Sequence, residues 1–261
     1  MYVFDNAAPI AGARLAALAA VHDPASFSHL AARGVTRGWH CLEIGGGLGT
    51  ITRWLSERVG PEGRVLTTDI DTRFLDGLQL ANVEVRRHDI QVDPLPAGVF
   101  DIAYARLVLE HLPDPDTALD RMVAALKPGG WLLVEDLEVR EASPDAPDPL
   151  DRGSRTAVVM RRVAERAGIR LGLAVSLPRR FRDRGLVEIG NEGRVRLCRG
   201  NSTDARLSRL NFEQLREPIL ATGEITPAEF DADLARLDDE DLVWRSPTLW
   251  AVWGRRSETA A

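Results

Sequence analysis

Apolar positions recur along the chain with two different periods, and each period predicts a type of element. Near the N-terminus Leu15, Leu18 and Val21 lie at helical spacing, and Pro24 is expected to open a second short helix that runs to Arg33. Short apolar runs then predict strands at 39–44, 64–69, 83–85, 100–105 and 131–135. Helical patterns lie between these runs at 50–59, through 74–78, from 107 to 112 and at 118–126. Strands that alternate with helices at this spacing imply βαβ units, and therefore an α/β fold whose parallel sheet is covered on both faces.

The alternation ends after Asp136. A proline-rich segment at 143–149 is too short to separate independent domains. It is long enough to start an insertion. The remaining patterns predict helices at 151–168, 172–184, 204–221 and 227–237, and strands at 187–197 and 249–253. Thr226 has the features of a helix cap, since a proline and then a glutamate follow it at the right spacing.

Composition and charge narrow the class of protein. The chain has 261 residues, of which 44% are hydrophobic and 28% charged, as in ordinary globular proteins. A formal net charge of −6 argues against a global positive field that attracts nucleic acid or an anionic membrane. Cys41 and Cys198 each lie in an apolar run and are expected to be buried thiols of a reducing cytoplasm. The chain has no run of about eighteen apolar residues and no secretory leader pattern, which disfavours membrane spanning and secretion.

A glycine-rich turn at 45–49 is the most informative segment. It follows a predicted strand and precedes a predicted helix, so its backbone can approach a ligand closely while the helix offers unpaired N–H groups. A nucleotide triphosphate loop needs a lysine at its end, and the single lysine of the chain is Lys127. A dinucleotide fingerprint needs glycine or alanine where Thr50 or Thr52 stands. The remaining pattern is an acid followed by alternate glycines, made of Glu43, Gly45, Gly47 and Gly49, with Gly46 inside it.

This pattern resembles the first motif of the class I S-adenosylmethionine-dependent methyltransferases. Later segments match the same family in order: an acid after the second strand, an acid after the third, and the signatures around 100–114 and 126–130. Together they cover roughly residues 39–136. The resemblance implies a doubly wound, mostly parallel seven-stranded sheet that ends in an antiparallel hairpin, for which 187–197 and 249–253 are candidates. The chain is similar to the ubiquinone and menaquinone biosynthesis type and to tailoring methyltransferases of bacterial secondary metabolism.

The resemblance also implies a set of cofactor-binding residues. Asp69 is expected to accept hydrogen bonds from both ribose hydroxyls, with Ile70 beside it and Asp71 as the second candidate. Asp89 matches the acid that meets the adenine amino group, while the backbone N–H of Ile90 meets the ring. The backbone at Ala105 and Arg106 matches the segment that holds the methionine end. No metal and no covalent intermediate are implied.

The reacting centre should lie at the carboxyl ends of the strands, near Arg106, His111 and Asp136. His111 is the best candidate for a general base, and a structural role at the end of its helix is the competing interpretation. Glu110 is the second catalytic candidate, although a supporting or surface role is favoured. Tyr2 joins this group if the N-terminal helix folds over the cofactor.

The sequence thus predicts one methyltransferase domain over residues 1–261, with a helical cover at 1–38, a cofactor core at 39–136 and a lid with a terminal hairpin at 137–261. The expected reaction is direct in-line transfer of a methyl group to a small organic acceptor in the cytoplasm. The alternatives are an RNA or protein methyltransferase and a non-catalytic S-adenosylmethionine-binding protein. Ten arginines stand against three acids at 151–184, which is interpreted as a solvated helix face rather than an RNA site. The oligomeric state is left open, and a homodimer is compatible with the sequence.

Overall fold

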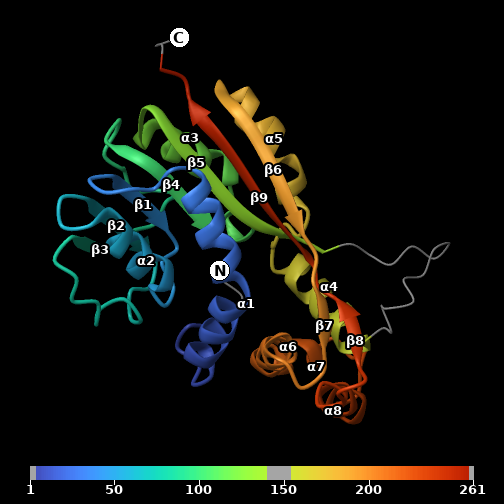
Figure 1. Cartoon of the computed structure of the whole chain (residues 1–261). Helices are drawn as coiled ribbons and strands as arrows, with labels where there is room; N and C mark the ends of the chain where they lie inside the picture. Colours follow the sequence, from blue (N-terminus) through green and yellow to red (C-terminus); the bar gives the residue numbers. More distant parts are fainter. Residues whose placement is uncertain (1–3, 140–153, 259–261) are drawn as a thin grey trace. The chain divides into compact units, whose positions relative to one another are not determined.

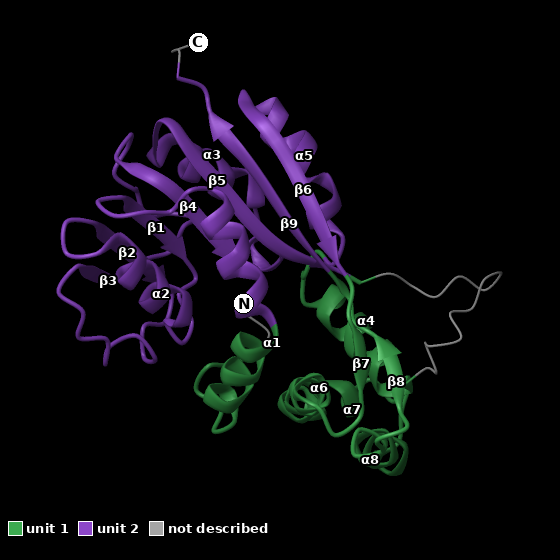
Figure 2. Ribbon diagram, viewed as in Figure 1, with its two compact units in different colours: residues 1–21, 139–170, 195–248 green, residues 22–138, 171–194, 249–261 purple. Residues whose placement is uncertain are grey.

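The computed structural model describes residues 4–139 and 154–258, and these residues form two compact units (Figures 1 and 2). The sheet unit contains residues 22–138, 171–194 and 249–261. The helical unit contains residues 1–21, 139–170 and 195–248. The division crosses helix α1, which is continuous from Ala11 to Ala32.

A seven-stranded sheet forms the centre of the sheet unit (Figure 1). Its strands are β1 (His40–Ile44), β2 (Arg64–Asp69), β3 (Val83–Arg87), β4 (Phe100–Arg106), β5 (Leu126–Glu138), β6 (Leu186–Arg194) and β9 (Thr248–Arg256). The order across the sheet is β3-β2-β1-β4-β5-β9-β6. The pairs from β3 to β5 are parallel, whereas β6 and β9 pair antiparallel. The seven-stranded, mostly parallel sheet and the terminal hairpin that the sequence predicted are therefore confirmed.

Side chains of successive strand residues pack on opposite faces of this sheet. On one face, residues such as Leu42 and Ala103 pack against helices α3 (Pro115–Ala125) and α5 (Leu173–Asp183). On the other face, residues such as Cys41 and Ile102 pack against α2 (Thr50–Val59) and the second half of α1. Strands covered on both faces read as nearly continuous apolar runs, which explains why the sequence pattern located them.

Helix α1 differs from the prediction, because Pro24 lies inside one continuous helix instead of opening a second one. A proline inside a helix costs about 3 kcal/mol through the lost N–H and the steric clash. The residues just after it are tied to the sheet: Ser26 Oγ donates to Glu135 Oε2, and His29 Nδ1 lies 2.6 Å from Glu135 Oε1. These tertiary bonds offset the cost of the proline, and the helix continues through it.

The helical unit has its own apolar core, formed by residues such as Val159, Phe212, Ile219 and Phe230. Its elements are α4 (Arg155–Arg166), α6 (Thr203–Gln214), α7 (Arg216–Ala221), α8 (Pro227–Arg236), β7 (Leu197–Arg199) and β8 (Val243–Arg245). Strands β7 and β8 pair antiparallel in a separate small sheet. Thr226 caps α8 with the reciprocal Glu229 bonds that the sequence indicated.

Several helix and strand boundaries that the sequence predicted were wrong. The run 187–197 divides between β6 and β7, which belong to different sheets, and the helix expected at 204–221 is two helices. The helical start at 107–112 is a short 3₁₀ helix, η1 (Leu109–His111). The expected helix through 74–78 is a hydrogen-bonded turn in which Leu75 N–H donates to the Thr72 carbonyl at 2.7 Å. Such a short segment has too few internal hydrogen bonds to be a stable helix unaided.

Both cysteines are free and buried, as expected. Among the residues that the structure describes, no helix has the length and apolar character needed to cross a membrane. The proline-rich segment 143–149 and Tyr2 lie outside the described residues. The division into a cover, a core and a lid stays a prediction.

Gly63 closes the turn that leads into β2, and substitution by alanine should destabilise the protein. A Cβ atom at Gly63 would lie 2.4 Å from Val59 Cβ and 2.7 Å from the Trp39 carbonyl oxygen. Overpacking of this kind costs about 1–3 kcal/mol. Urea denaturation should therefore show a lower free energy of unfolding for Gly63→Ala. Gly77→Ala is the matched control, because nothing lies within 4 Å of its Cβ position; equal stability of the two variants would contradict the packing argument.

Candidate functional site

The predicted site residues gather at one edge of the sheet unit, where the parallel strands end. Asp89 follows β3, Asp69 ends β2, the glycine turn follows β1, Arg106 ends β4, and Asp136 lies near the end of β5. Strands β1 and β4 are neighbours, but the chain continues from β1 into α2 on one face of the sheet and from β4 toward α3 on the other face. Ligands of doubly wound sheets bind at such a point. Neighbouring strands are about 4.8 Å apart, so β3 and β4 are separated by about 14 Å.

The glycine turn is built by close backbone contacts. The N–H groups of Gly45 and Gly46 both donate to the Thr68 carbonyl, at 2.7 and 3.0 Å. A Cβ atom at Gly45 would lie 2.4 Å from Val108 Cγ2, and one at Gly46 would lie 2.3 Å from Thr67 Oγ1. Side chains at these positions would push apart the ends of β1, β2 and β4.

Gly47 is different, because its surroundings are open. Its φ of +53° favours glycine, yet nothing lies within 4 Å of its Cβ position. The exposed backbone at this point can therefore be approached by a ligand, and helix α2 begins at Thr50 directly behind the turn. The residues present fit an adenosyl amino acid, whose polar tail needs such a backbone surface.

Glu43 lies beneath the turn. Its carboxylate is 2% exposed and accepts hydrogen bonds from Thr52 Oγ1 at 2.5 Å and Thr67 Oγ1 at 3.0 Å. Burial raises its pKa to about 7, even though both hydroxyls act in the opposite direction. Glu43 thus joins β1, α2 and β2 below the glycines, and we interpret it as a support for the turn.

Asp69 and Asp71 have different environments. Asp69 accepts the Gly47 N–H at 3.0 Å and the Asp71 N–H at 3.1 Å, and burial raises its pKa. Asp71 is more exposed and is paired with Arg73, whose hydrogen bond lowers the pKa of Asp71. Asp69 is therefore hydrogen-bonded directly to the glycine turn, whereas Asp71 is hydrogen-bonded to Arg73 within its own loop. Ile70, between them, is 52% exposed and presents an apolar surface at the same edge.

Asp89 and Ile90 lie in a tight turn after β3. Asp89 Oδ1 accepts the Gln91 N–H at 2.8 Å, and the Asp89 carbonyl accepts the N–H groups of Val92 and Asp93. The Ile90 side chain is 3% exposed and belongs to the apolar core. Only the backbone of Ile90 can therefore meet a ligand.

Arg106 and Ala105 end β4 beside the glycine turn. Ala105 is fully buried and pairs with Ile44 in the parallel register. The Arg106 guanidinium donates to Asp23 at 2.8 Å and to Ser26 at 2.9 Å, both on α1. The next residue, Leu107, has a φ of +54°, a strained conformation for a leucine that often marks functional loops.

Glu135, which sequence reasoning did not select, holds this region together. Its carboxylate meets Tyr104 Oη at 2.7 Å, together with Ser26 and His29 of α1. Burial alone would raise its pKa, but these partners and the Arg106 charge lower it, so Glu135 stays ionised. Its place at the end of an apolar strand was the only available signal in the sequence.

Glu110 and Asp136 form a buried pair of acidic residues. Glu110 Oε2 accepts the Leu137 N–H at 3.0 Å, and Asp136 Oδ1 accepts the Val108 N–H at 3.2 Å, so each acid is bound to the other's segment. Burial raises the pKa of both carboxyls, and the Glu110 charge raises that of Asp136 further. The pair therefore retains a proton near neutral pH. Within the described residues Asp136 Oδ2 has no hydrogen-bond partner.

His111 lies next to this pair. Its Nε2 atom is 3.4 Å from Glu110 Oε1, and its side chain is 13% exposed. A histidine with one nitrogen near a carboxylate and partial solvent access can accept or deliver a proton at this edge. The structure thus brings His111, Glu110 and Asp136 together.

Many arginines of the 151–184 segment are paired with acids. On α4, Arg162 and Arg166 both contact Glu224. Arg180 of α5 and Arg184, the residue directly after that helix, both contact Asp116. Over residues 4–139 and 154–258, no cluster of three or more metal-ligating side chains is found.

Comparison with known protein families shows which part of the chain has recognisable relatives. Residues 42–134 match the sequence profile of a family described as a methyltransferase domain. This range holds the glycine turn and the strands from β1 to most of β5. This part of the chain is therefore similar to a methyltransferase domain.

Among individual relatives, the ubiquinone/menaquinone biosynthesis C-methyltransferase of Idiomarina loihiensis is 37% identical over 109 residues. These residues are 39% of this chain and 43% of that protein, so the alignment spans less than half of the relative.

Solved structures agree on the fold. Phosphoethanolamine N-methyltransferase 2 of Haemonchus contortus, in complex with phosphomonomethylethanolamine and S-adenosylhomocysteine, has a TM-score of 0.63 at 16% identity. The match covers 99% of this chain and 61% of that one. The [4+2]-cyclase SpnF has a TM-score of 0.54 at 20% identity and covers 90% of this chain and 81% of its own. Proteins named for different reactions thus share this fold, so the function must be argued from the site.

The buried Glu43 should make stability depend on pH. In the folded chain its pKa is about 7, against an ordinary value of 4.5, so between these values the unfolded chain binds fewer protons. This contribution to stability therefore falls as pH rises from 4.5 to 7 and is constant above, with a slope of at most about 1.4 kcal/mol per pH unit. Urea denaturation of Glu43→Gln should show a smaller loss of stability between pH 5 and 8 than the wild type. Parallel pH profiles would show that Glu43 titrates normally.

Proposed function

We propose that this chain transfers the methyl group of S-adenosylmethionine to a small organic acceptor by direct in-line displacement. The observation that carries the proposal is the order of groups along one sheet edge. Asp89, Asp69, the glycine turn and Arg106 follow one another across β3, β2, β1 and β4. This order corresponds to adenine, ribose and amino-acid tail, and it leaves the ends of β4 and β5 for the acceptor.

Each end of the proposed cofactor has a matching group. The Asp69 carboxylate would accept the two ribose hydroxyls, and the open backbone at Gly47 would meet the amino-acid tail. Asp89 and the Ile90 backbone would meet the adenine edge. When bound, S-adenosylmethionine supplies a methyl group on a positively charged sulfur with a good leaving group already in place.

The protein's contribution is therefore mainly orientation and exclusion of water. Holding two reactants in line accounts for as much as about 7–11 kcal/mol of a reaction barrier. The fixed segment after β4 suits this task, because Leu107 N–H donates to the Glu135 carbonyl and Val108 packs on Gly45.

An acceptor that loses a proton needs a base, and His111 is the proposed one. It is more exposed than Glu110, whose carboxylate is 4% exposed and bound to the Leu137 N–H. Glu110 then lies beside His111 as a carboxyl group that can gain or lose a proton. Its pairing with Asp136 keeps a proton within the site near neutral pH.

The acceptor class follows from the comparisons and the charge. The relatives named as ubiquinone/menaquinone biosynthesis enzymes suggest a quinone-like ring or another small secondary metabolite. The net charge of −6 and the acid-paired arginines disfavour RNA. Two free buried cysteines support the cytoplasm as the compartment.

Asp69 provides the test of cofactor binding. Asp69→Asn should weaken binding of S-adenosylhomocysteine in calorimetry by about tenfold or more, since hydrogen bonds to a charged group contribute about 1.5–3 kcal/mol. Asp71→Asn is the matched control and should bind almost as tightly as the wild type, because Asp71 is paired with Arg73. Unchanged affinity in Asp69→Asn would remove the ribose assignment.

His111 provides the test of chemistry. Transfer of a labelled methyl group from S-adenosylmethionine to a panel of phenols and hydroquinones should fall by about 100-fold or more in His111→Ala, with cofactor affinity nearly unchanged. His40→Ala is the control, since His40 begins β1 at the opposite end of the strand. Full activity of His111→Ala would leave His111 a structural residue. Cofactor binding without transfer to any acceptor in the wild type would favour the non-catalytic alternative.

A further inference from the structure

The turn after β3 is held from behind by helix α3. Asp114 is the N-cap of α3, and its backbone forms two hydrogen bonds with the Gln91 side chain. Gln91 Nε2 donates to the Asp114 carbonyl at 2.9 Å, and Gln91 Oε1 accepts the Asp114 N–H at 2.9 Å. An amide that pairs with a backbone in both directions fixes distance and orientation together.

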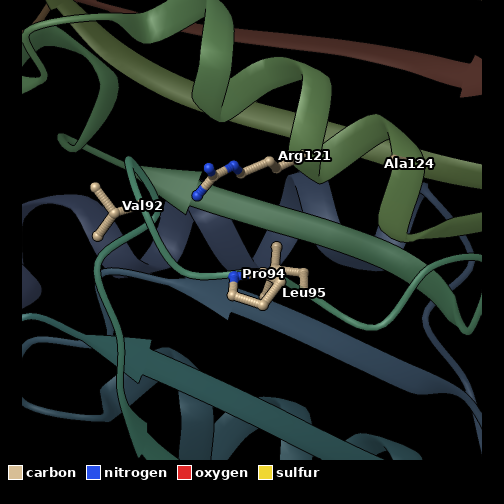
Figure 3. A pocket seen from close by; sticks show the side chains of 5 residues that line it. All are labelled: Val92, Pro94, Leu95, Arg121 and Ala124. Carbon is tan, nitrogen blue, oxygen red and sulfur yellow. The ribbon is translucent and has the colours of Figure 1, made fainter.

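Arg121 adds a second attachment two turns farther along α3. Its Nη1 atom donates to the Ile90 carbonyl at 2.9 Å and to the Asp93 carbonyl at 2.7 Å. Figure 3 shows the Arg121 side chain reaching from α3 toward the segment that carries Val92, Pro94 and Leu95. These residues and Ala124 line an open hollow of about 220 Å³.

The turn also binds itself. Asp93 Oδ2 accepts the Asp89 N–H at 2.8 Å, and the Asp89 carbonyl accepts the Asp93 N–H at 2.8 Å. In a planar trans peptide the N–H and C=O groups point in opposite directions. Because the Asp89 carbonyl points into the turn, the Ile90 N–H on the same peptide points away from it.

Within the described residues, these contacts leave one backbone donor and one carboxylate oxygen of the turn without a hydrogen bond. Asp89 Oδ1 accepts the Gln91 N–H, and no hydrogen bond within the described residues engages Asp89 Oδ2. An acceptor next to a donor matches the amino group and ring nitrogen of adenine. It mismatches hypoxanthine, which carries an oxygen and a ring N–H at those positions.

We propose that Gln91 and Arg121 are positioning residues that set the base selectivity of the cofactor site. They hold the 89–93 turn against α3 so that Asp89 and the Ile90 N–H present the pattern complementary to adenine. This inference rests on the proposed function, since it assigns the adenine end of the cofactor to this turn. It adds two residues that lie behind the site and do not touch the base.

The test compares two nucleosides, S-adenosylhomocysteine and S-inosylhomocysteine, by calorimetry. The wild type should bind the adenosyl compound at least tenfold more tightly. Gln91→Ala and Arg121→Gln should each weaken adenosyl binding by about threefold to tenfold, because a hydrogen bond contributes about 0.5–1.5 kcal/mol. Inosyl binding should change little, so selectivity should fall. Arg121→Lys should restore much of it, since one ammonium can reach both carbonyls.

Two matched controls separate positioning from general stability. Gln214 also donates to a backbone carbonyl, that of Asp5, and Arg256 donates to carbonyls at the other end of α3. Gln214→Ala and Arg256→Gln should leave the selectivity at the wild-type value, even where thermal unfolding shows lower stability.

The outcomes distinguish the two proposals. If the wild type binds neither nucleoside, the proposed function fails, and the base-selectivity inference fails with it. If the wild type binds the adenosyl compound selectively and both variants keep that selectivity, only the roles of Gln91 and Arg121 are refuted. A parallel loss of affinity for both nucleosides would likewise refute base selectivity and indicate a purely structural contact.

Discussion

The close approach of three strand ends at the glycine turn is the constraint on which the site depends. Gly45 touches Val108 after β4, and Gly46 touches Thr67 of β2, at distances that leave no room for a side chain. Because β2, β1 and β4 end so close together, Asp69 reaches the Gly47 N–H and the strained Leu107 lies beside the same turn. The open space at Gly47 is what remains for a ligand after this packing.

A second property of this edge of the sheet is that several of its carboxyl groups are either protonated or surrounded by hydrogen-bond donors. Glu43 keeps a proton up to about pH 7, and Glu110 and Asp136 retain one between them. Glu135 is ionised, but Tyr104, Ser26, His29 and Arg106 surround that charge. Asp69 and Asp89 lie at the ends of β2 and β3, and in the proposed function they receive the ligand's hydroxyl and amino hydrogens. The count of acids in the sequence therefore overstates the negative charge that a bound molecule would meet.

Much of the sheet unit was predictable because its strands are buried on both faces and its turns need glycine. The pattern located β1, β2, β4 and β5 and the glycines between β1 and α2, which follow from local chemistry. It missed the continuous α1, since the bonds that stabilise the helix through Pro24 come from Glu135, more than a hundred residues away. It missed Gln91 and Arg121 for the same reason: their partners are backbone atoms of distant segments, and backbone atoms leave no mark in a sequence. The split of 187–197 between two sheets depends on tertiary pairing, which a periodic pattern does not encode.

The proposed base-binding turn and the proposed acceptor site are connected through a single short stretch of chain. Asp114, which pairs with Gln91 behind the turn after β3, follows the 3₁₀ helix that carries Glu110 and His111. Glu110 in turn binds the backbone of β5 at Leu137. The residues that would recognise the base and those that would act on the acceptor thus share one rigid connection. The same fold also occurs in a cyclase, so the fold alone does not set the reaction, and in the proposed function the groups after β4 and β5 act on the acceptor. The Glu110–Asp136 pair with its neighbour His111, and not the glycine motif, is therefore the group of residues from which the chemistry of this chain should be worked out.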